Sequence, residues 1–532
     1  MRVRANPLWG MLPALLAAGL CAPVGVLAQD AETRMQQLEE QLRALTQELD
    51  ALKQQVREQR TAQPTPDQQT LDADLKKAQA EAAAAAATAA DAKEKAVAAE
   101  QRLEQNTLQR LPDGVGWQDP RGRWSARLQG RLQLDYRTYD PEGMLANTFA
   151  IRRARLGLQV VFLSDYVFRV EGEYASGNGA VGPQGVAATH VYMGVNWLSP
   201  YARIILGQTK PQFGLENTAS ANFSDFLERG LTQNLIGSLN YDRGIFFDGA
   251  PFTGFNYGVS ITNGTGLNTN ERQGNAQEAQ ADGKMLTVRV SENFAALAKL
   301  EESVIHIGYD YKQGIAANSP ASPFPAATGT TEALGLTFFT PQAFNAATGA
   351  SASNVERSWN DFELALAHGP LKLQGEYMTV NYQGTRNAPA PVVNYSLDID
   401  AYYVNLMWMI TGEAYADSYK DGQFGRIRPR NNFDWKNRTW GGWELGLRYS
   451  VFDASDFGPG KPAFAGALAT TSPVTQSTNE ATAWTVGLKW LPNAYTRFML
   501  NYIRTDFETP VIANSITTSN ETAVTLRGQF DF

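Results

Sequence analysis

The sequence predicts an all-β transmembrane barrel of about 16 antiparallel strands, preceded by an α-helical coiled coil. Three observations predict this fold class. The last ten residues, 523–532, alternate apolar and polar side chains and end on Phe532. Many segments after residue 117 repeat this period-two pattern, as expected where one face of a strand meets lipid and the other meets water. A heptad pattern fills residues 33–60. An edge strand of a soluble sandwich also alternates, so only the repetition favours a barrel.

Residues 1–28 have the parts of a secretory signal peptide. A basic start precedes an apolar run at 8–20, and Val-Leu-Ala at 26–28 is a small-residue cleavage site. The run is too short and too rich in alanine and glycine for a membrane anchor. Cys21, the only cysteine, would leave with this peptide. A lipoprotein is the alternative, but it needs a small residue before the cysteine, and a leucine stands there.

Residues 29–62 are predicted to form a coiled coil, because apolar residues recur at alternating steps of three and four. Pro64 and Pro66 mark a linker at 63–70. An alanine-rich helix at 71–111 resumes the spacing, with very high helix propensity. The alternatives are a lone amphipathic helix for the first stretch and a single helix or spacer for the second. The seam of the first stretch is Met35, Leu38, Leu42, Leu45, Leu49, Leu52 and Val56.

From residue 117 to 532, strand patterns separated by turn residues replace the helical ones. The sequence gives 17 candidate strands, and a bacterial barrel has an even number, so one candidate should be a miscalled or lumenal segment. Long gaps near 213–240, 264–282, 313–331, 341–356 and 454–479 should be loops outside the cell or inside the pore. The candidates lie near 123–138, 149–163, 166–176, 188–197, 201–209, 242–249, 253–263, 283–292, 303–312, 332–339, 357–368, 371–382, 397–411, 440–453, 480–490, 495–507 and 520–532.

The alternating strands assign a charged face and an apolar face to the predicted barrel. In the first strand Leu132 and Leu134 oppose Arg131 and Asp135, and in the last strand Leu526 and Phe530 oppose their charged neighbours. A charge that faces lipid at the middle of a bilayer costs about 2–4 kcal/mol. The charged faces should therefore line a wet interior.

Composition excludes several classes of function. The net charge is −8, whereas a nucleic-acid binder would be basic. The three histidines, His190, His306 and His368, are isolated and lack metal-ligand spacing. There is no nucleophile elbow and no paired acid and base. The sequence therefore predicts no enzyme, no cofactor and no metal.

Four short stretches together resemble the phosphate-selective porin O and P family. They are Gly130-Arg131-Leu132-Gln133 with Asp135-Tyr136; Ile151-Arg152-Arg153-Ala154-Arg155-Leu156 leading to Asp165-Tyr166; Gly207-Gln208 with Lys210-Pro211 and Phe213-Gly214-Leu215-Glu216; and Thr411-Gly412-Glu413 with Trp443-Glu444 and Arg448-Tyr449. The resemblance covers the predicted barrel and implies a sixteen-stranded trimeric channel of the outer membrane. It also implies an anion site at a pore constriction built from basic residues and a few hydroxyls.

The resemblance places Arg131, Arg152, Arg153 and Ser220 at this constriction. The faces of three neighbouring strands add Arg127, Arg155 and Arg169 to one basic wall. Guanidinium groups suit phosphate and carboxylate oxygens, and rings of arginine or lysine select anions in pores. The alternative is ordinary pairing with Glu171 and Glu173. Adjacent Arg152 and Arg153 can both face inward only at a bulge; otherwise Arg152 lies near the strand end.

The sequence departs from the phosphate-selective pattern at two positions. Asn217 and Val167 stand where phosphate-selective members carry lysine. A different basic cluster, Arg426, Arg428 and Arg430, alternates so that its side chains would project into one pore mouth; a solvated basic loop is the alternative reading. The resemblance thus favours anions without fixing phosphate.

The function predicted from the sequence is a passive outer-membrane channel for small anions, phosphate or related, in a Gram-negative-type bacterium. The expected partners are these anions, outer-membrane lipid and two further copies of the chain in a homotrimer. The amino-terminal extension would lie in the periplasm. One alternative is an envelope tether whose coiled coil contacts peptidoglycan or another periplasmic partner. Another is a soluble β-rich adhesin on a coiled-coil stalk.

Overall fold

The computed structural model divides the chain into two units, Met1–Leu108 and Gln109–Phe532. It describes residues 109–110 and 115–532, except 176–185, 265, 268–283, 316–327, 342–350, 389–391 and 458–477, together with scattered positions between 47 and 95. In the first unit the described positions are helical and exposed, and Lys95 pairs with Asp91 one turn before it at 2.8 Å. The predicted signal peptide at 1–28, the linker at 63–70 and the pairing of helices into a coiled coil lie outside the described residues.

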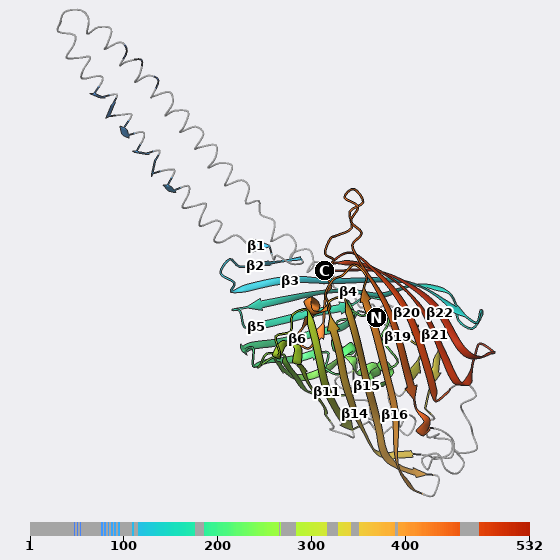
Figure 1. The fold of residues 1–532 in the computed structure, drawn as a ribbon. Coiled ribbons are helices and arrows are strands. Elements are labelled where there is room, and N and C mark those ends of the chain that lie inside the picture. Colours follow the sequence, from blue (N-terminus) through green and yellow to red (C-terminus); the bar gives the residue numbers. More distant parts are fainter. Residues whose placement is uncertain are drawn as a thin grey trace, which may run out of the picture. The chain divides into compact units, whose positions relative to one another are not determined.

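The second unit is a closed barrel of 16 antiparallel strands, each paired with its sequence neighbour, and the last strand pairs with the first. Phe532 completes the closure by exchanging two backbone hydrogen bonds of 3.1 Å with Gly130. Among the described residues, no helix is long and apolar enough to cross a membrane. The barrel strands (Figure 1) are β3 (Trp124–Asp140), β4 (Thr148–Phe162), β5 (Tyr166–Glu173), β6 (Ala187–Leu198), β7 (Ala202–Thr209), β8 (Asp242–Gly249), β9 (Phe255–Thr262), β10 (Met285–Asn293), β11 (Ser303–Ile315), β14 (Ser351–His368), β15 (Leu371–Ala388), β16 (Val393–Met409), β19 (Gly442–Asp453), β20 (Glu480–Asn493), β21 (Thr496–Ala513) and β22 (Ile516–Asp531).

The remaining elements are short. β2 pairs with β3 beyond the point where β22 ends, and β1 pairs with β2. Elsewhere, short helices and two small hairpins occupy the connections between barrel strands. These elements are β1 (Gln109–Arg110), β2 (Val115–Gln118), α4 (Leu215–Thr218), α5 (Gln233–Ile236), η2 (Gly237–Asn240), α6 (Phe294–Leu297), β12 (Gly329–Thr330), β13 (Thr337–Phe339), η4 (Tyr415–Ser418), β17 (Tyr419–Lys420), β18 (Gln423–Phe424) and η5 (Ser455–Phe457).

The prediction of 16 strands is confirmed, and one of the 17 candidates is not part of the barrel wall. The candidate at 332–339 lies between β11 and β14, where β13 pairs only with β12 in a separate two-stranded sheet. Phe338 and Phe339 are buried in an apolar cluster inside the barrel. Their apolar run resembled a wall strand because a buried hairpin and a lipid-facing strand both need apolar side chains.

The barrel has two different ends. At the end where β3 begins and β22 stops, here called the terminus end, most connections between strands are short, such as 369–370 and 494–495. At the opposite end, the loop end, longer connections include 210–241 and 316–350. One connection breaks this rule: residues 410–441, between β16 and β19, form a long segment at the terminus end.

The predicted lipid-facing and water-facing sides are found in the structure. In β22 Leu526 and Phe530 are about half exposed on the outside, whereas Arg527 and Asp531 are buried on the inside. β3 repeats this arrangement, with Leu132 and Leu134 outward and Gln133 and Asp135 inward. The charged faces therefore line the interior, as the cost of lipid-exposed charge requires.

Toward the loop end, strands β14 to β16 reverse this polarity. Asn360, Thr379 and Asp400 lie directly opposite one another on adjacent strands, and all three face outward. Two residues closer to the terminus end, the outward neighbours are Phe362, Tyr377 and Tyr402. The inward residues change in the opposite sense toward the loop end. They are acidic at Glu363 and Glu376, and apolar and buried at Trp359, Val380 and Ile399. The aromatic row therefore marks where the apolar belt ends, and the strands continue beyond it as a wall with an apolar interior.

The position of this boundary can be tested by comparing the cost of an arginine on either side of it, on the outward face of one strand. Leu406 of β16 faces outward within the apolar run from Tyr402 to Ile410, which extends about 26 Å along the strand. Leu406→Arg should lower the free energy of unfolding in lipid by about 2–4 kcal/mol. Ser396→Arg, on the same face of β16 but beyond the boundary, should cost at most about 1 kcal/mol. Denaturant unfolding in lipid vesicles measures both, and equal costs would contradict the boundary.

Candidate functional site: a basic passage beside an inward loop

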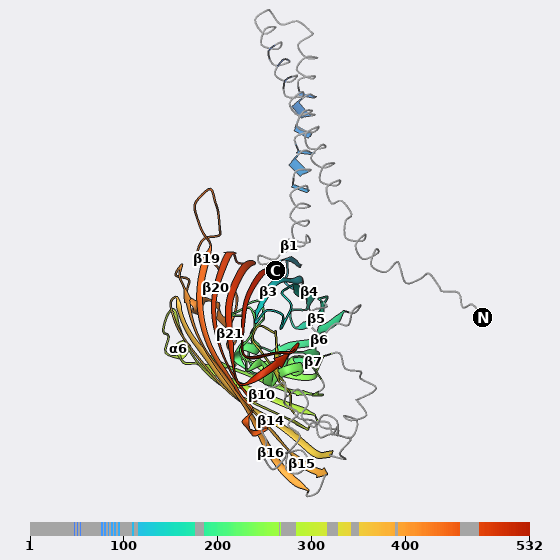
Figure 2. The same ribbon diagram turned by 90° about the vertical axis from the view of Figure 1, so that its right-hand side faces the viewer.

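The loop between β7 and β8, Lys210–Tyr241, folds into the barrel; it is here called the inner loop. Figure 2 shows its short helices within the ring of strands. Its apolar side chains Phe213, Leu231 and Leu235 pack into a cluster that also contains Trp359 and Met378 of the wall. The loop is thus packed against β14 and β15, and a passage remains between the loop and the opposite wall of β3 to β5, where three cavities lie.

These three cavities share wall residues and follow one another along the interior. The central cavity, of about 400 Å³, lies between the predicted basic wall and the inner loop. The loop-end cavity, of about 610 Å³, shares Arg153, Arg155 and Tyr241 with it. The terminus-end cavity, of about 400 Å³, shares Arg131 and Arg155 with it. A solute that crosses the barrel on this side would pass all three.

The structure brings most of the predicted site residues together at the central cavity. Arg131, Arg153, Arg155, Arg169 and Ser220 all line it, and the Arg131 guanidinium donates to the Ser220 hydroxyl at 3.2 Å. Arg127 lines the neighbouring terminus-end cavity. The wall and the inner loop therefore meet at the central cavity.

Pairing divides these arginines into two groups. Arg155 binds Glu173 at 2.7 Å and Glu171 at 3.3 Å, and Arg169 binds Glu171 at 2.8 Å. Arg131 and Arg153 have no carboxylate within ion-pair distance among the described residues. Instead, Arg131 donates to the Ser220 hydroxyl, and Arg153 donates to the Gln133 amide oxygen at 3.0 Å. Of the four wall arginines at the central cavity, Arg131 and Arg153 are therefore the two whose positive charge is not neutralised by a carboxylate among the described residues. These two can attract a mobile anion.

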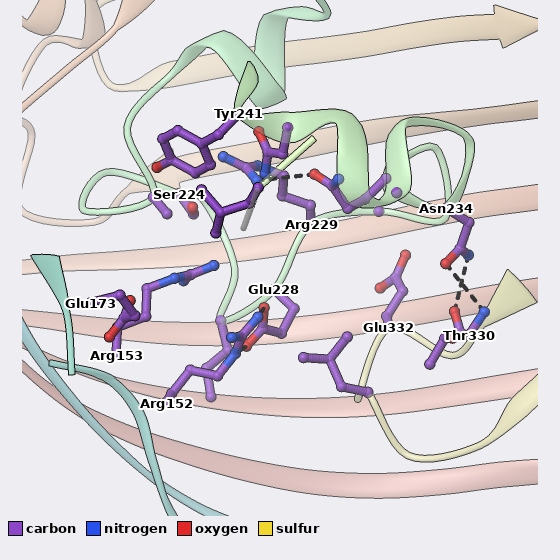
Figure 3. Close-up of a pocket in the computed structure, with 18 of the residues that line it drawn as sticks. Arg152, Arg153, Glu173, Ser224, Glu228, Arg229, Asn234, Tyr241, Thr330 and Glu332 are labelled. Atoms are coloured by element: carbon purple, nitrogen blue, oxygen red, sulfur yellow. Dashed lines mark hydrogen bonds and ion pairs between the residues drawn. The ribbon is translucent and has the colours of Figure 1, made fainter. Parts of the chain in front are cut away.

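Arg152 and Arg153 both face the interior because β4 has a bulge there. Gln133 of β3 pairs with Arg153, but the next residue, Leu134, pairs with Ile151, so Arg152 is the extra residue. Figure 3 shows Arg152 directed at Glu228 of the inner loop. Its guanidinium binds that carboxylate through two hydrogen bonds of 2.7 and 3.0 Å. Arg152 thus holds the loop rather than facing the central cavity.

Glu228 is the main electrostatic anchor of the inner loop. Besides Arg152, it binds Arg137 at 2.9 Å and Arg527 at 2.7 Å, and Asp135 binds the latter two. Burial raises the pKa of the Glu228 carboxyl, but the three guanidinium groups outweigh burial and hold this pKa well below its usual range. Glu228 is therefore ionised at neutral pH.

The inner loop contributes two basic residues that the sequence analysis did not select. Lys210 donates to the carbonyl oxygens of Asn217 and Ala219 at 2.6 and 3.5 Å. Arg229 donates to three loop carbonyl oxygens and to Gln233. Neither has a carboxylate within ion-pair distance among the described residues, and both line the central cavity. Lys210 belongs to the Gly207-Gln208 and Lys210-Pro211 stretch that carries the family resemblance, so the sequence could have identified it as a site residue. Arg229 belongs to none of these stretches.

Nearby arginines lower the pKa values of two groups at the central cavity, Lys210 and Tyr241. Burial lowers the pKa of the Lys210 ammonium well below its usual value, and Arg229, Arg155 and Arg131 lower it further. Burial raises the pKa of the Tyr241 phenol, yet Arg155 and Arg131 outweigh it and the pKa is lowered. Arg155 also donates to the Tyr241 hydroxyl at 2.7 Å. An anion in the cavity would relieve this repulsion.

The predicted basic cluster lies in the segment 410–441 at the terminus end. Arg426 binds Asp531 and lies 5.1 Å from the ring centre of Phe223 in the inner loop. Arg426 and Arg428 line the terminus-end cavity together with Arg127 and Arg131. Arg430 is outside the lining of that cavity, and its backbone N–H donates to Glu413 at 3.1 Å. Two of the three arginines therefore face the passage.

The two residues that depart from the phosphate-selective pattern, Asn217 and Val167, do not line the central cavity. The Asn217 side chain donates to the Phe213 carbonyl at 3.0 Å within the inner loop, and its own carbonyl accepts from Lys210 and Arg229. Val167 packs with Tyr192, Ile205 and other apolar residues.

The chain is similar to several solved structures at low sequence identity. OmpT of Vibrio cholerae is 10% identical, with a TM-score of 0.44 over 77% of this chain and 98% of that chain. The outer membrane channel DcaP of Acinetobacter baumannii is 10% identical, with a TM-score of 0.43 over 80% and 99%. OprB of Pseudomonas putida is 9% identical, with a TM-score of 0.45 over 77% and 94%. No curated protein matches the sequence.

The family model described as phosphate-selective porin O and P matches residues 127–320 and 340–532, which together make up most of the chain and nearly all of the barrel. The match includes the wall arginines, the inner loop and the closing strand. The chain therefore belongs to the phosphate-selective porin O and P family, and it is a β-barrel channel of the outer membrane.

Proposed function

We propose that this porin is a passive, anion-preferring channel whose solutes are small anions such as phosphate. The observation that carries this proposal is the set of four basic residues at the central cavity, Arg131, Arg153, Lys210 and Arg229, that have no carboxylate partner among the described residues. Seven basic and two acidic residues line this cavity. Such a surplus of cationic groups attracts anions and repels cations.

The arrangement of donors suits oxyanions in particular. Guanidinium groups present planar pairs of N–H donors that match phosphate or carboxylate oxygens. Arg131 and Arg153 approach from the wall, whereas Lys210 and Arg229 approach from the inner loop. An oxyanion between them would exchange its water shell for donors on two sides. Arg127, Arg426 and Arg428 would then receive it at the terminus-end cavity.

The two ends of the barrel support an orientation. Outer-membrane barrels have short periplasmic turns and longer extracellular loops, so the terminus end would face the periplasm. Residue 109, where the barrel unit begins, belongs to β1 at this end. The amino-terminal extension would accordingly lie in the periplasm, within reach of peptidoglycan. We further propose a homotrimer, as the family resemblance implies; light scattering of the detergent-solubilised porin would show three copies per particle.

Reversal potentials in a salt gradient across a planar bilayer test the anion preference. The porin should be anion-selective, and Arg131→Ala and Arg153→Ala should each lower the anion-to-cation permeability ratio about two- to threefold. One charge at about 8 Å in water shifts the energies of an anion and a cation by about 0.5 kcal/mol in opposite directions, and screening at about 0.1 M salt roughly halves this difference. Lys299→Ala, which removes an exposed charge in a terminus-end turn, should leave the ratio unchanged. Cation selectivity of the parent channel would rule out the proposal.

A further inference from the structure

Four carboxylates are buried together on the wall opposite the basic passage. Asp310 lies on β11, Asp361 and Glu363 on β14, and Glu376 on β15, each less than 5% exposed. Asp310 pairs directly across the sheet with Asp361, and Glu363 with Glu376. Like charges directly opposite one another destabilise a sheet, so this cluster needs compensation by positive charge or by protons.

The described residues provide less positive charge than four carboxylates require. Arg289 binds Glu363 through two hydrogen bonds of 2.9 and 2.7 Å and lies 3.7 Å from Asp310. His306 contacts Glu363 at 2.9 Å. Neither Asp361 nor Glu376 has a basic side chain within ion-pair distance among the described residues. A buried carboxylate without a partner is strongly destabilising.

Asp361 points most clearly to a missing ligand. Both of its carboxylate oxygens are buried and accept no hydrogen bond from an N–H or O–H group, and the same holds for Oδ1 of Asp310. Asp361 lies beside the Glu376 carboxyl and Asp310 beside that of Glu363, and either pair could form a hydrogen bond only if one of its members carried a proton. Oxygen atoms of Asp310, Asp361 and Glu363 all lie within 4.8 Å of one another. That spacing fits three oxygens around one ion at about 2.4 Å, and carboxylate oxygens are the ligands that calcium prefers.

We propose that Asp310, Asp361 and Glu363 bind a divalent cation of the calcium type. The ion would balance the charge that Arg289 leaves uncompensated. It would also bind the otherwise unpartnered oxygens of Asp361. Since the three residues lie outside the linings of the cavities described above, the ion would enter during folding, as metals that couple to folding do.

The position of the cluster gives this ion a structural role, because the inner loop and the segment 410–441 both form hydrogen bonds to the carboxylates or to the residues that bind them. From the inner loop, the Gly214 N–H donates to Asp310, and the Glu216 N–H donates to Glu376 at 3.0 Å. Gly214 has a φ of 76°, and a Cβ there would lie 2.9 Å from Glu376 Oε1 and 3.4 Å from Asp361 Oδ2. Only glycine lets the loop backbone approach the carboxylates so closely.

The segment 410–441 reaches the same cluster from the terminus end. The Tyr419 hydroxyl contacts His306 Nδ1 at 2.7 Å, and the other nitrogen of His306 contacts Glu363. Arg289, which binds Glu363, also donates to the Gly422 carbonyl at 2.9 Å. A cation at the cluster would therefore fix the carboxylates that hold both segments lining the passage.

Refolding of the full porin in detergent, with calcium or with a chelator, tests the proposal. Porin refolded with calcium and then desalted should retain one equivalent of calcium by mass spectrometry of the metal, and its thermal unfolding temperature should exceed that of porin refolded with chelator. Asp361→Asn should refold without bound calcium. Glu356→Gln, an exposed position on the outward face of the same strand, should bind calcium like the parent protein.

Terbium luminescence locates the ion. Trp359 lies on the inner face of β14 two residues from Asp361, about 6.6 Å away along the strand, so its indole should sensitise terbium bound at the cluster. Trp359→Phe should remove this luminescence while calcium binding persists. A parent porin that refolds without metal and does not respond to calcium would overturn the proposal, as would an Asp361→Asn variant that binds calcium normally. Protons shared among the four carboxylates would then balance the charge.

Discussion

Replacing both Arg131 and Arg153 by glutamate is expected to remove most of the anion preference of the channel. The central cavity is lined by seven basic and two acidic residues, and the double substitution changes these numbers to five and four. Both arginines belong to wall strands, and their described contacts are to Ser220 and Gln133. Only one of these contacts, from Arg131 to Ser220, reaches the inner loop. The double substitution should therefore disturb the loop less than substitution of Lys210 or Arg229, each of which makes several hydrogen bonds within the loop.

The expected size follows from the charge change. Two unit charges 8 Å apart interact by about 0.5 kcal/mol in water, and screening at 0.1 M salt acts over about 10 Å. Four units of charge then change the energy of a passing ion by about 2 kcal/mol before screening. We expect the anion-to-cation permeability ratio to fall about tenfold or more, since 1.4 kcal/mol corresponds to a factor of ten.

A matched variant separates the local field from the net charge of the protein. Lys299→Glu combined with Arg504→Glu makes the same charge change at exposed positions, one in a terminus-end turn and one on the outer face of β21. Its permeability ratio should equal that of the parent channel in planar-bilayer reversal potentials. If both double variants shift the ratio equally, the central cavity is not the selective region.

The wall of the barrel could be predicted from the sequence because lipid and water impose opposite demands on alternate residues. All 16 strands that close the barrel were among the candidates, although several extend further than predicted. The candidate at 371–382 belongs to β15, which runs from Leu371 to Ala388. Beyond Tyr377 the outward residues become polar and the inward ones apolar, so a pattern defined by outward apolar residues weakens there. A reversal of polarity along one strand was not part of the expected pattern.

The candidate site could be anticipated mainly where it lies on strands; on the inner loop only Ser220 was expected, and that through the family resemblance. Arg131 and Arg153 could be placed by alternation. The adjacent arginines at 152 and 153 left two possibilities open, a bulge or a strand end, and the structure contains the bulge. Glu228 follows no period, because the inner loop is irregular and the ion pairs of this carboxylate reach arginines 76 to 299 positions away. Arg229 also follows no period, although its hydrogen bonds stay within the loop. Long-range ion pairs of this kind leave no local signal in one sequence.

Glu228→Gln is expected to destabilise the porin more than any single substitution in the basic passage. It removes the carboxylate that binds Arg137, Arg152 and Arg527 and leaves Asp135 as the acidic neighbour of two of them. Removal of one partner from a buried ion pair typically costs about 3–5 kcal/mol. Denaturant unfolding in detergent measures this loss, and Glu356→Gln, at an exposed position on β14, should change stability little.

The same carboxylate predicts a pH dependence that distinguishes lost charge pairing from altered packing. The folded pKa of Glu228 lies well below its ordinary value of 4.5, so its contribution is present above pH 4.5 and is lost as the pH falls through the folded pKa. Glutamine cannot titrate. The stability difference between the parent and Glu228→Gln should therefore be constant from neutral pH to about pH 5 and shrink at lower pH.

A second substitution tests whether the arginines are the cause. If the cost of Glu228→Gln comes from guanidinium groups left without a carboxylate, Arg152→Gln in the same chain should recover part of the stability, because one uncompensated charge is removed. The double-mutant cycle should then give a coupling energy of about 1–3 kcal/mol between Glu228 and Arg152. Additive costs would show instead that Glu228 acts through its shape, and the inner loop would be held by its apolar side chains against β14 and β15.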